Sequence, residues 1–456
     1  MEKNLSSEII MEKDKCLAAY ELFKKSEAGK GPSWLVSFRD EAMAGFREKN
    51  FPTLHDEAWK YTSLEPLLKL AFTPAYGKPS NGAKANLAGK SPGESAGPRM
   101  VFVNGTYVPS LSSLAGLPGK VKMVNLKSVW TSEGGLMERH WSSRNAAQRG
   151  IFSELNSAFF HDGVLLHLPK DSFSEKPLEV IYFSSSQDRN MISHPRNLVI
   201  AEKGSRSTVI ERYIGLDESV YFTNAVTDFV LEEGASVEFY RIQKEGRQAF
   251  HISDTHVSAG RDSRFVSFNL DAGGGLVRNY LEVAMRAEGS ECDLNGLYVA
   301  DHAQHIDNET VIDHLKPQGT SRQLYKGILD GKAEAVFSGK IFVRQDAQKT
   351  DAAQKNKNLL LSDEAKVDTK PQLEIFADDV KCAHGAAVGQ LNEDEIFYLR
   401  SRGMDEEAAK RVLTYGFAHE IVDRIRLEPL KNELEYWLAE RFQNHTGVKE
   451  VGLGKF

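Results

Sequence analysis

The chain has 456 residues, of which 41% are hydrophobic and 27% charged, as is typical of globular proteins. Its net charge of −7 disfavours a phosphate-binding basic surface, so nucleic acid is a poor candidate partner. Residues 1–15 contain no apolar run, which argues against a signal peptide, and no stretch reaches membrane-spanning length. With only three cysteines, the chain is expected to be cytoplasmic and to lack a disulfide framework.

The N-terminal region, residues 1–163, is predicted to be mostly helical. One helical face is apolar and carries Trp34, Leu35, Phe38 and Phe46. Pro52 follows where this helix should stop. A further helix is expected from about Trp141 to Phe160, before the segment turns at Gly163.

A flexible linker is predicted at about residues 73–99, which are rich in Gly, Pro, Ser, Ala and Lys. It contains Gly89, Lys90 and Ser91, which are the end of a phosphate-binding loop motif. The first glycine of that motif would fall at position 84, which is Lys84, and no apolar strand precedes it. The sequence therefore disfavours an ATPase.

Residues 164–388 consist of short alternating strands that restart after a glycine at near-constant intervals. The restarts are at Gly204, Gly234, Gly260, Gly289 and Gly319. A repeat of this length with several strands per unit predicts a right-handed parallel β-helix, that is, a β-solenoid. The protein is therefore expected to be mainly β, with helical regions on either side. The alternative is an antiparallel sandwich, in which hairpin turns recur every 8–12 residues.

The C-terminal region, residues 389–456, is predicted to be helical. Asn392 can cap one helix that ends at Gly403, and Asp405 can cap the next. This second helix has an apolar stripe of Ala409, Val412, Leu413, Gly416, Phe417 and Ile421. A glycine within a helix costs about 1 kcal/mol relative to alanine. Gly416 would be explained if another surface approaches the helix closely.

Cys382 and His384 are the strongest candidate ligands in the sequence. If residues 381–386 form a strand, both side chains project from the same face. Thiolate and neutral imidazole both bind iron, but an iron–sulfur cluster normally takes four protein ligands. The remaining ligands must then come from another chain. Taken alone, the residues favour simple structural roles, a buried thiol and a hydrogen-bonded histidine, over metal binding.

The segment 301–314 carries several polar residues, among them His302, His305, Asp307 and His314. On a strand His305 and Asp307 share one face while His302 points away, so we expect a solvated rim rather than a metal site. Asp378 and Asp379 are adjacent and would face opposite ways on a strand, so a charged turn is favoured over a catalytic carboxylate pair.

Four blocks of the sequence resemble the SufB/SufD family of the SUF iron–sulfur cluster assembly system. They are EAWKYTSLEPLL at 57–68, FVNGTYVPSLSSL at 102–114, SHPRNLVIAEKGSRSTVIERYIG at 193–215 and FADDVKCAHGAAVGQLNEDEIFYLRSRGM at 376–404. The resemblance extends over most of the chain. The single cysteine of the last block and the Trp-Lys-Tyr-Thr segment resemble the SufD branch. The chain differs from the commoner SufD pattern at Ala383 and Ala387, where hydroxyl residues are expected, so hydrogen bonds from those hydroxyls are missing here.

The resemblance implies a non-catalytic scaffold that pairs with SufB and binds the ATPase SufC, supporting cluster formation and iron acquisition. It places His384 at the contact with SufB, and it makes Cys382 a second candidate ligand of a transient cluster shared with that partner. It also implies that the C-terminal helices dock SufC and that the isolated subunit can form a homodimer. The alternatives are a solenoid carbohydrate-active enzyme, which typically needs export and grouped side chains, and a purely structural adaptor without a ligand.

Overall fold

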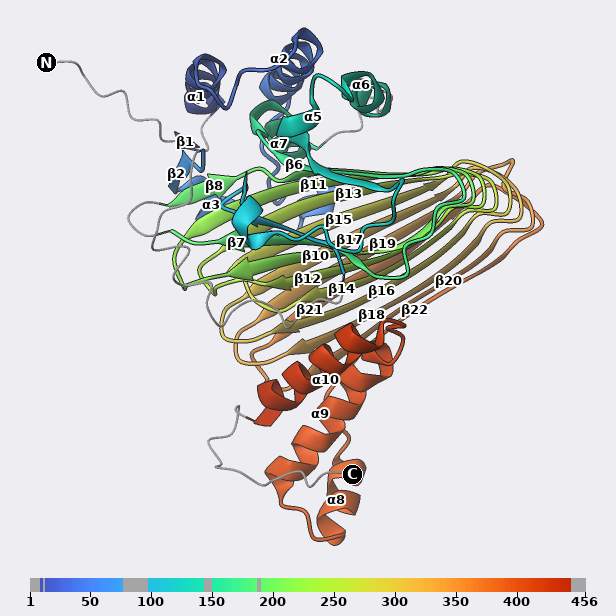
Figure 1. The fold of residues 1–456 in the computed structure, drawn as a ribbon. Coiled ribbons are helices and arrows are strands. Elements are labelled where there is room, and N and C mark those ends of the chain that lie inside the picture. The colour runs from blue at the N-terminus through green and yellow to red at the C-terminus, as the bar shows by residue number, and fades with distance from the viewer. Residues whose placement is uncertain (1–8, 11–12, 77–96, 143–149, 187–189, 444–456) are drawn as a thin grey trace, which may run out of the picture.

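The computed structural model describes residues 9–10, 13–76, 97–142, 150–186 and 190–443. It is a parallel β-solenoid with one group of helices before it and another after it, which confirms the predicted fold class (Figure 1). The two helical groups pack on different sheets of the solenoid.

Each coil of the solenoid contributes one strand to each of two sheets. The first sheet contains β6 (Gly163–Leu168), β8 (Met191–Ser193), β9 (Arg196–Ala201), β11 (Tyr221–Leu231), β13 (Phe250–Ala259), β15 (Leu276–Met285), β17 (His305–His314), β19 (Glu334–Val343) and β21 (Lys366–Ile375). The second contains β7 (Leu178–Ser184), β10 (Arg206–Gly215), β12 (Ser236–Lys244), β14 (Arg264–Asp271), β16 (Glu291–Ala300), β18 (Thr320–Leu329), β20 (Asp351–Leu360) and β22 (Lys381–Gly389). Neighbouring strands from β9 and β7 onward are parallel, so each coil lies on the one before it.

The repeat is fixed by a turn residue with a left-handed backbone, two residues before each second-sheet strand from β10 to β20. This position is held by Gly204, Gly234, Asp262, Gly289, Gln318 and Lys349, with φ between 52° and 71°. Glycine adopts this conformation without strain, whereas other residues do so less readily. Gly260 and Gly319, which the sequence suggested as repeat markers, lie close to this position but do not occupy it.

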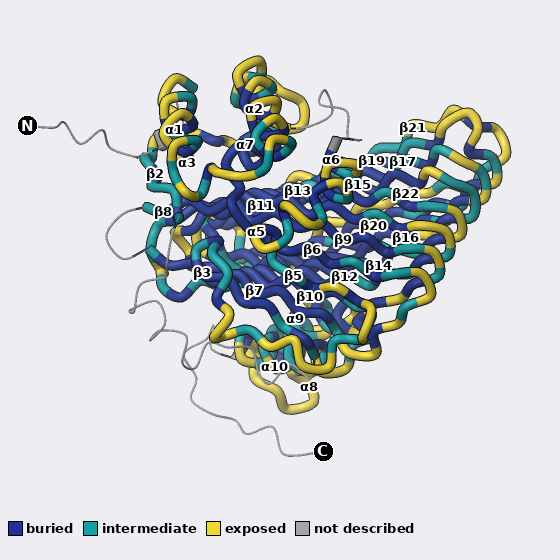
Figure 2. The backbone as a smooth tube through the Cα atoms, turned by 45° about the horizontal axis from the view of Figure 1, so that its top comes forward, coloured by how far each residue is buried: buried dark blue, intermediate teal, exposed yellow. Residues whose placement is uncertain are grey.

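Most residues of the solenoid strands are buried, as the dark blue tube in Figure 2 shows. Alternate side chains of a strand point to opposite faces, so each strand sends every second side chain into the interior. Near the left-handed turns this interior is apolar. Phe229 of the first sheet contacts Phe239 and Phe265 of the second, with ring centroids 4.8 and 5.3 Å apart. Burial of such rings supplies most of the stabilisation of stacked coils.

The N-terminal region forms helices and short strands that cover the first coils. In chain order they are β1 (Ile9–Ile10), α1 (Lys13–Lys25), α2 (Ser33–Glu48), η1 (Glu57–Trp59), α3 (Glu65–Leu68), β2 (Ala71–Pro74), β3 (Arg99–Val103), β4 (Thr106–Tyr107), η2 (Pro109–Leu111), β5 (Lys122–Asn125), α5 (Leu126–Val129), α6 (Gly134–Ser142) and α7 (Ile151–Phe159). The predicted helix before Pro52 is α2. In the described residues, the predicted helix from Trp141 to Phe160 corresponds to the end of α6 and the whole of α7, and residues 143–149 lie outside the described ranges.

The predicted linker at 73–99 lies mostly outside the described residues, which end at 76 and resume at 97. The incomplete phosphate-loop motif at 89–91 falls in that gap. At its two ends the segment joins β2 and β3, which pair with the solenoid through β8 and β7.

The C-terminal region forms α8 (Glu393–Ser401), α9 (Glu406–Val422) and α10 (Glu428–Gln443). The caps occur as predicted: Asn392 accepts a hydrogen bond from the Asp394 amide at 2.8 Å, and Asp405 accepts one from the Ala408 amide at 2.7 Å. Helices α9 and α10 pack on the outer face of the second sheet, where they bury apolar residues including Ile210, Phe268, Leu297, Ile421, Leu434 and Leu438.

Two buried histidines lie where the N-terminal region meets the solenoid. His161 contacts the Tyr76 ring at 5.2 Å, and His194 stacks on Phe159 at 5.6 Å. Burial lowers the pKa of both imidazoles to about 3. Asp162, between them in the chain, has a carboxyl pKa that burial raises to about 6.

These shifts predict that the N-terminal region becomes less stable as the pH falls below about 6.5. The two histidines are neutral in the folded state, whereas in the unfolded state they bind protons below pH 6.5. The free energy of unfolding therefore falls as the pH drops from 6.5 towards 3, by about 2 kcal/mol for each histidine between pH 6.5 and 5. Asp162 acts oppositely and offsets part of this loss. Denaturant unfolding of wild type and of a His161→Gln/His194→Gln variant at pH 7 and pH 5 measures the effect. The variant should be less stable at pH 7 but lose less between the two pH values; an equal loss would contradict the assignment.

Candidate functional site

The C-terminal end of the solenoid is open. β22 pairs with β20 and β21 pairs with β19, and no described strand lies on the other side of either. Large apolar side chains are exposed there, including Ile375, Phe376 and Val388 at 41, 58 and 47%. Unpaired edges with exposed apolar residues readily accept a strand from another chain.

Cys382 and His384 lie on the inner row of β22 at this open end. They are in register with Ala352 and Gln354 of β20, both of which point into the solenoid and are 1% exposed. Cys382 is half-buried against the apolar core, whereas His384 is exposed. The structure thus places the two predicted ligands side by side on one face.

The surroundings of the two side chains differ in a way that affects ligand binding. Burial raises the pKa of the Cys382 thiol, so the thiolate that binds a metal is disfavoured in the isolated chain. The imidazole of His384 is exposed. Within the described residues no three His, Cys, Asp or Glu side chains are grouped to hold a metal ion.

Ala383 and Ala387 lie on the opposite, outer row of β22, in register with Ala353 and Lys357. Ala387 borders an open groove of about 420 Å³ between the end of β22 and helix α9. Leu413 and Phe417 line the other side of the same groove. The departures from the expected hydroxyl pattern therefore affect the outer face and this groove, and they leave the row of Cys382 and His384 unchanged.

The predicted docking stripe on α9 is divided between two environments. Ile421 is fully buried against the second sheet, and the ring of Phe417 lies 4.0 Å from the Lys326 ammonium of β18. Val412 is 48% exposed, and no atom lies within 4 Å of a side-chain position at Gly416. Leu413 is half-buried. The stripe therefore both packs internally and presents a free face.

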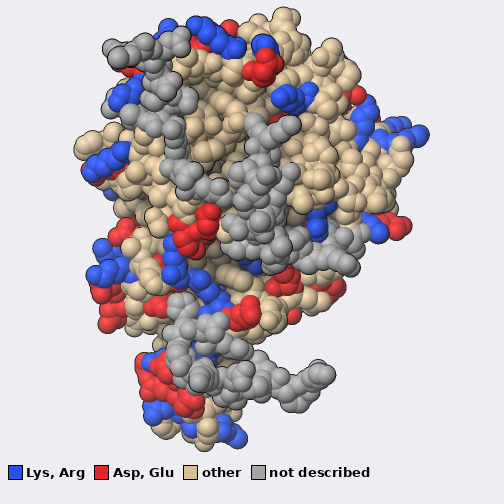
Figure 3. Space-filling model, turned by 60° about the vertical axis from the view of Figure 1, so that its left-hand side comes forward, with Lys and Arg blue, Asp and Glu red and all other residues tan. Residues whose placement is uncertain are grey.

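Helix α8 supplies exposed apolar residues that the sequence analysis did not select. Phe397 and Tyr398 are 72 and 57% exposed, and Ile396 is the buried residue of this helix. The first turns of α8 and α9 carry Glu393, Asp394, Glu395, Glu406 and Glu407. Basic side chains lie among them: Arg400 and Lys410 pair with Glu406, and Arg402 lies over the Tyr398 ring. Figure 3 shows acidic and basic side chains gathered on this lower part of the molecule. The sequence signal for these exposed residues was the run Ile396, Phe397 and Tyr398, because one face of a short helix cannot bury three consecutive apolar side chains.

Segment 301–314 differs from the predicted solvated rim. His305 and Asp307 do share the outer face of β17, and His302 lies in a turn with φ of 55°. Asp307 and His314, however, are 1 and 0% exposed. His314 points inward and its Nε2 is 2.9 Å from the Ser321 hydroxyl. The rim prediction was wrong for these two residues because the outer face of β17 is covered and its inner face lies in the core.

The cover over β17 is the Trp-Lys-Tyr-Thr segment. The Thr62 hydroxyl donates to the Asp307 carboxylate and lies 3.0 Å from His305 Nε2. Arg278 of β15 forms ion pairs with Asp307 and Glu309, and its guanidinium lies 3.9 Å from the Trp59 ring. This motif therefore fixes the N-terminal segment to the outside of the first sheet.

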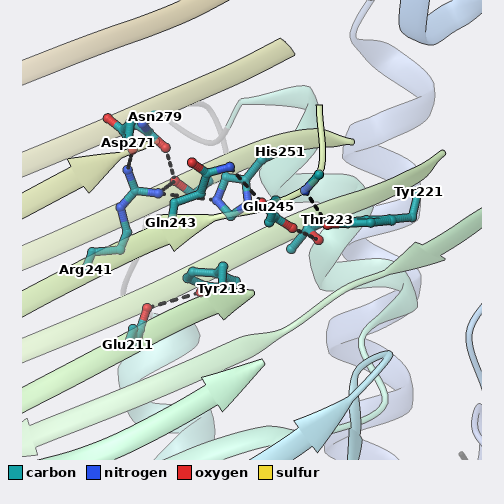
Figure 4. A network of polar contacts seen from close by, with 12 residues as sticks. Glu211, Tyr213, Tyr221, Thr223, Arg241, Gln243, Glu245, His251, Asp271 and Asn279 are labelled. Atoms are coloured by element: carbon teal, nitrogen blue, oxygen red, sulfur yellow. Dashed lines mark hydrogen bonds and ion pairs between the residues drawn. The ribbon is translucent and has the colours of Figure 1, made fainter. Parts of the chain in front are cut away.

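The interior of the early coils holds a buried polar network (Figure 4). Arg241 donates to Asp271 and to Ser253, and both charged residues are at most 2% exposed. His251 lies 2.7 Å from Glu245, which accepts a hydrogen bond from the Thr223 hydroxyl at 3.0 Å. The sequence analysis did not predict this network. Its signal was the pair of polar residues at alternate positions of β12, Arg241 and Gln243.

Comparison with known families matches almost the whole described chain. Residues 182–417 match the SUF system FeS cluster assembly, SufBD core domain, and residues 13–180 match the SufBD protein N-terminal region. The chain belongs to the SufBD family. Its family core thus includes the open end with Cys382 and His384 and most of α9.

Individual SufBD relatives are similar over much of their length. An iron-sulfur cluster assembly SufBD family protein of Synechocystis sp. is 32% identical, covering 91% of this chain and 92% of the relative. The iron-sulfur cluster assembly protein SufD of Escherichia coli is 32% identical, covering 86 and 89%. SufD of Bacillus subtilis is 27% identical, covering 61 and 64%. These comparisons support a role in SUF iron–sulfur cluster assembly.

None of the helices in the described ranges is both long and apolar enough to traverse a lipid bilayer.

The buried Arg241–Asp271 pair gives a stability prediction for this SufBD core. Arg241→Met should lower the free energy of unfolding by about 3–5 kcal/mol, because it leaves the Asp271 carboxylate buried without its ion pair. Adding Asp271→Asn removes that charge and should recover a large part of the loss. Denaturant unfolding of the two single variants and the double variant measures the coupling. Additive losses would show that the pair is not coupled.

Proposed function

We propose that this chain is a SufD-like scaffold subunit of the SUF system that pairs with SufB in the cytoplasm. The observation that supports this best is the open end of the solenoid, where Cys382 and His384 stand on the inner row of an unpaired strand. A SufBD partner of the same architecture can bring its own strands to these edges. The ligands supplied by both chains then meet at one boundary.

The iron–sulfur cluster is cargo in this proposal, held transiently between the two subunits. His384 offers an accessible imidazole. Cys382 offers a thiol whose raised pKa disfavours the thiolate, so it would bind as a ligand once a metal ion or a positive charge is near. SufB would contribute the remaining ligands. The same exposed edges would let the isolated subunit form a homodimer, in competition with SufB.

The C-terminal helices are proposed to dock SufC. Phe397 and Tyr398 of α8 and Val412 of α9 are exposed apolar residues, and we call them together the helical docking surface. Both acidic and basic side chains lie on these helices, so they fit a partner with an apolar patch and a polar, charged rim. Gly416 leaves room for a close backbone approach beside this surface.

Two other functions are less well supported. A carbohydrate-active solenoid enzyme is disfavoured because the matched relatives are named for cluster assembly. A structural adaptor without a ligand differs from the proposed scaffold in one measurable respect. Iron and sulfide analysis of the anaerobically purified complex separates them, since an adaptor would leave cluster content independent of Cys382 and His384.

The first functional prediction concerns His384. His384→Ala should leave the complex with SufB and SufC intact but strongly reduce cluster formation, because the imidazole is lost while the backbone is kept. His302→Ala is the matched control, since its side chain is 64% exposed in a turn away from the open end. Absorbance and iron content of each anaerobically purified complex are compared with wild type. Wild-type cluster content in the His384 variant would return this residue to a structural role.

The second concerns the helical docking surface. Val412→Asp and Phe397→Asp each place a charge on the exposed apolar patch and should greatly reduce co-purification of SufC. Tyr436→Asp on α10, at a site 67% exposed, should retain it. Phe417 is a less suitable probe because it packs on Lys326 inside the chain. Circular dichroism checks folding, and retained SufC binding by both folded variants would place the docking surface elsewhere.

A further inference from the structure

Gln354 lies directly beneath the candidate ligand His384. The two residues are register partners on β20 and β22, so their side chains leave neighbouring strands on the same inward face. Gln354 is 1% exposed, whereas His384 is exposed at the open end. The buried amide is therefore an immediate neighbour of the exposed imidazole within the solenoid.

The Gln354 amide nitrogen already has a partner on the side away from His384. It donates to the Gln323 side-chain oxygen of β18 at 2.6 Å, and the Gln323 amide nitrogen donates to the Thr310 hydroxyl at 2.7 Å. All three residues are at most 4% exposed. This short chain of hydrogen bonds runs from the first sheet across the interior, and it fixes the orientation of the Gln354 amide.

The Gln354 side-chain oxygen, by contrast, is buried and has no hydrogen-bond partner among the described residues. A buried acceptor left unpaired is unfavourable, and native proteins normally satisfy it. The two arms of the planar amide diverge, so with the nitrogen toward Gln323 the oxygen is turned away from that coil. The next coil in the other direction is β22, which carries His384 on this row.

We propose that Gln354 is a positioning residue for His384. A hydrogen bond between the two side chains is not made in the ring orientation of this structure. A turn of the exposed His384 side chain towards β20 lets its Nδ1–H donate to the Gln354 oxygen, which fixes the tautomer and leaves Nε2 available to bind iron. Histidine ligands of metals usually donate their second ring nitrogen to such an acceptor, which orients the ring. This inference rests on the proposed function of His384. It assigns to the buried Gln354 the role of orienting the His384 ring before iron binds.

Three variants of the full-length chain test the assignment. Gln354→Leu removes the acceptor. Gln354→Glu keeps an acceptor, because Gln323 can reverse its amide and donate to the carboxylate while the Thr310 hydroxyl donates in turn. Asn356→Leu is the matched control: Asn356 is equally buried on the same row but pairs with Ala386, which has no side-chain donor. Thermal unfolding of the two leucine variants compares the general cost of losing a buried amide.

The decisive measurement is the ¹⁵N chemical shift of the His384 ring in histidine-labelled protein at pH 8, assigned by its absence in His384→Ala. Wild type, Gln354→Glu and Asn356→Leu should show mainly the Nδ1–H tautomer, and Gln354→Leu should shift towards Nε2–H. An unchanged tautomer in Gln354→Leu, or an equal shift in Asn356→Leu, would overturn the proposal. This measurement needs neither partner nor cluster.

Cluster formation in the complex with SufB and SufC tests the consequence. Loss of an orienting partner typically lowers metal affinity or activity about 10- to 100-fold, so Gln354→Leu should form cluster at least about tenfold more slowly, while Asn356→Leu stays near wild type. If His384→Ala impairs assembly but Gln354→Leu does not, the positioning role falls and the proposed site stands. If His384→Ala has no effect, the proposed site fails, and the tautomer alone decides whether Gln354 orients the ring.

Discussion

The structure depends on one constraint: every coil of a parallel solenoid must have its strand edges paired by a neighbour. At the beginning, β5 pairs with β6 and β3 pairs with β7, so N-terminal strands close both edges. At the end, β21 and β22 have no further strand among the described residues. The two ends of the solenoid are therefore chemically different. One is finished within the chain, and the other presents unsatisfied backbone groups that a second chain can pair.

The same stacking explains how polar side chains can be tolerated inside. Each inward row places like positions of successive coils next to one another, so a polar residue in one coil finds a polar partner in the next. Gln354 meets its register partner Gln323 in this way, and Arg241 reaches Asp271, two residues beyond its own register partner Asn269. Such pairing satisfies buried groups that would be costly alone. One exception lies beneath the last strand of the second sheet, where the Gln354 side-chain oxygen has no partner among the described residues.

The fold could be predicted from the sequence because coil length and alternation are local patterns. The glycine period indicated the solenoid, although Asp262 and Gln318 hold the turn position at two coils where glycine was expected. Contacts between segments far apart in the sequence were not predictable. Asp307 was predicted to lie on a solvated rim, but the segment at Thr62, some 245 residues away in the sequence, buries it. For the site, strand alternation correctly placed Cys382 and His384 on one face. The division of the α9 stripe, with Ile421 buried and Val412 exposed, required the position of the second sheet.

A site at an unfinished edge has a consequence for when it can act. In the proposed complex, Cys382 and His384 supply only part of a ligand set, and burial raises the pKa of the Cys382 thiol, which disfavours the thiolate. Pairing of β22 by SufB would complete the sheet and bring the missing ligands in the same step. The ligand set and the subunit interface then form together, so an isolated subunit would bind iron weakly and the assembled pair would bind it well. Under this proposal the open end would make cluster binding conditional on assembly, because this chain offers two of the four ligands that a cluster normally takes.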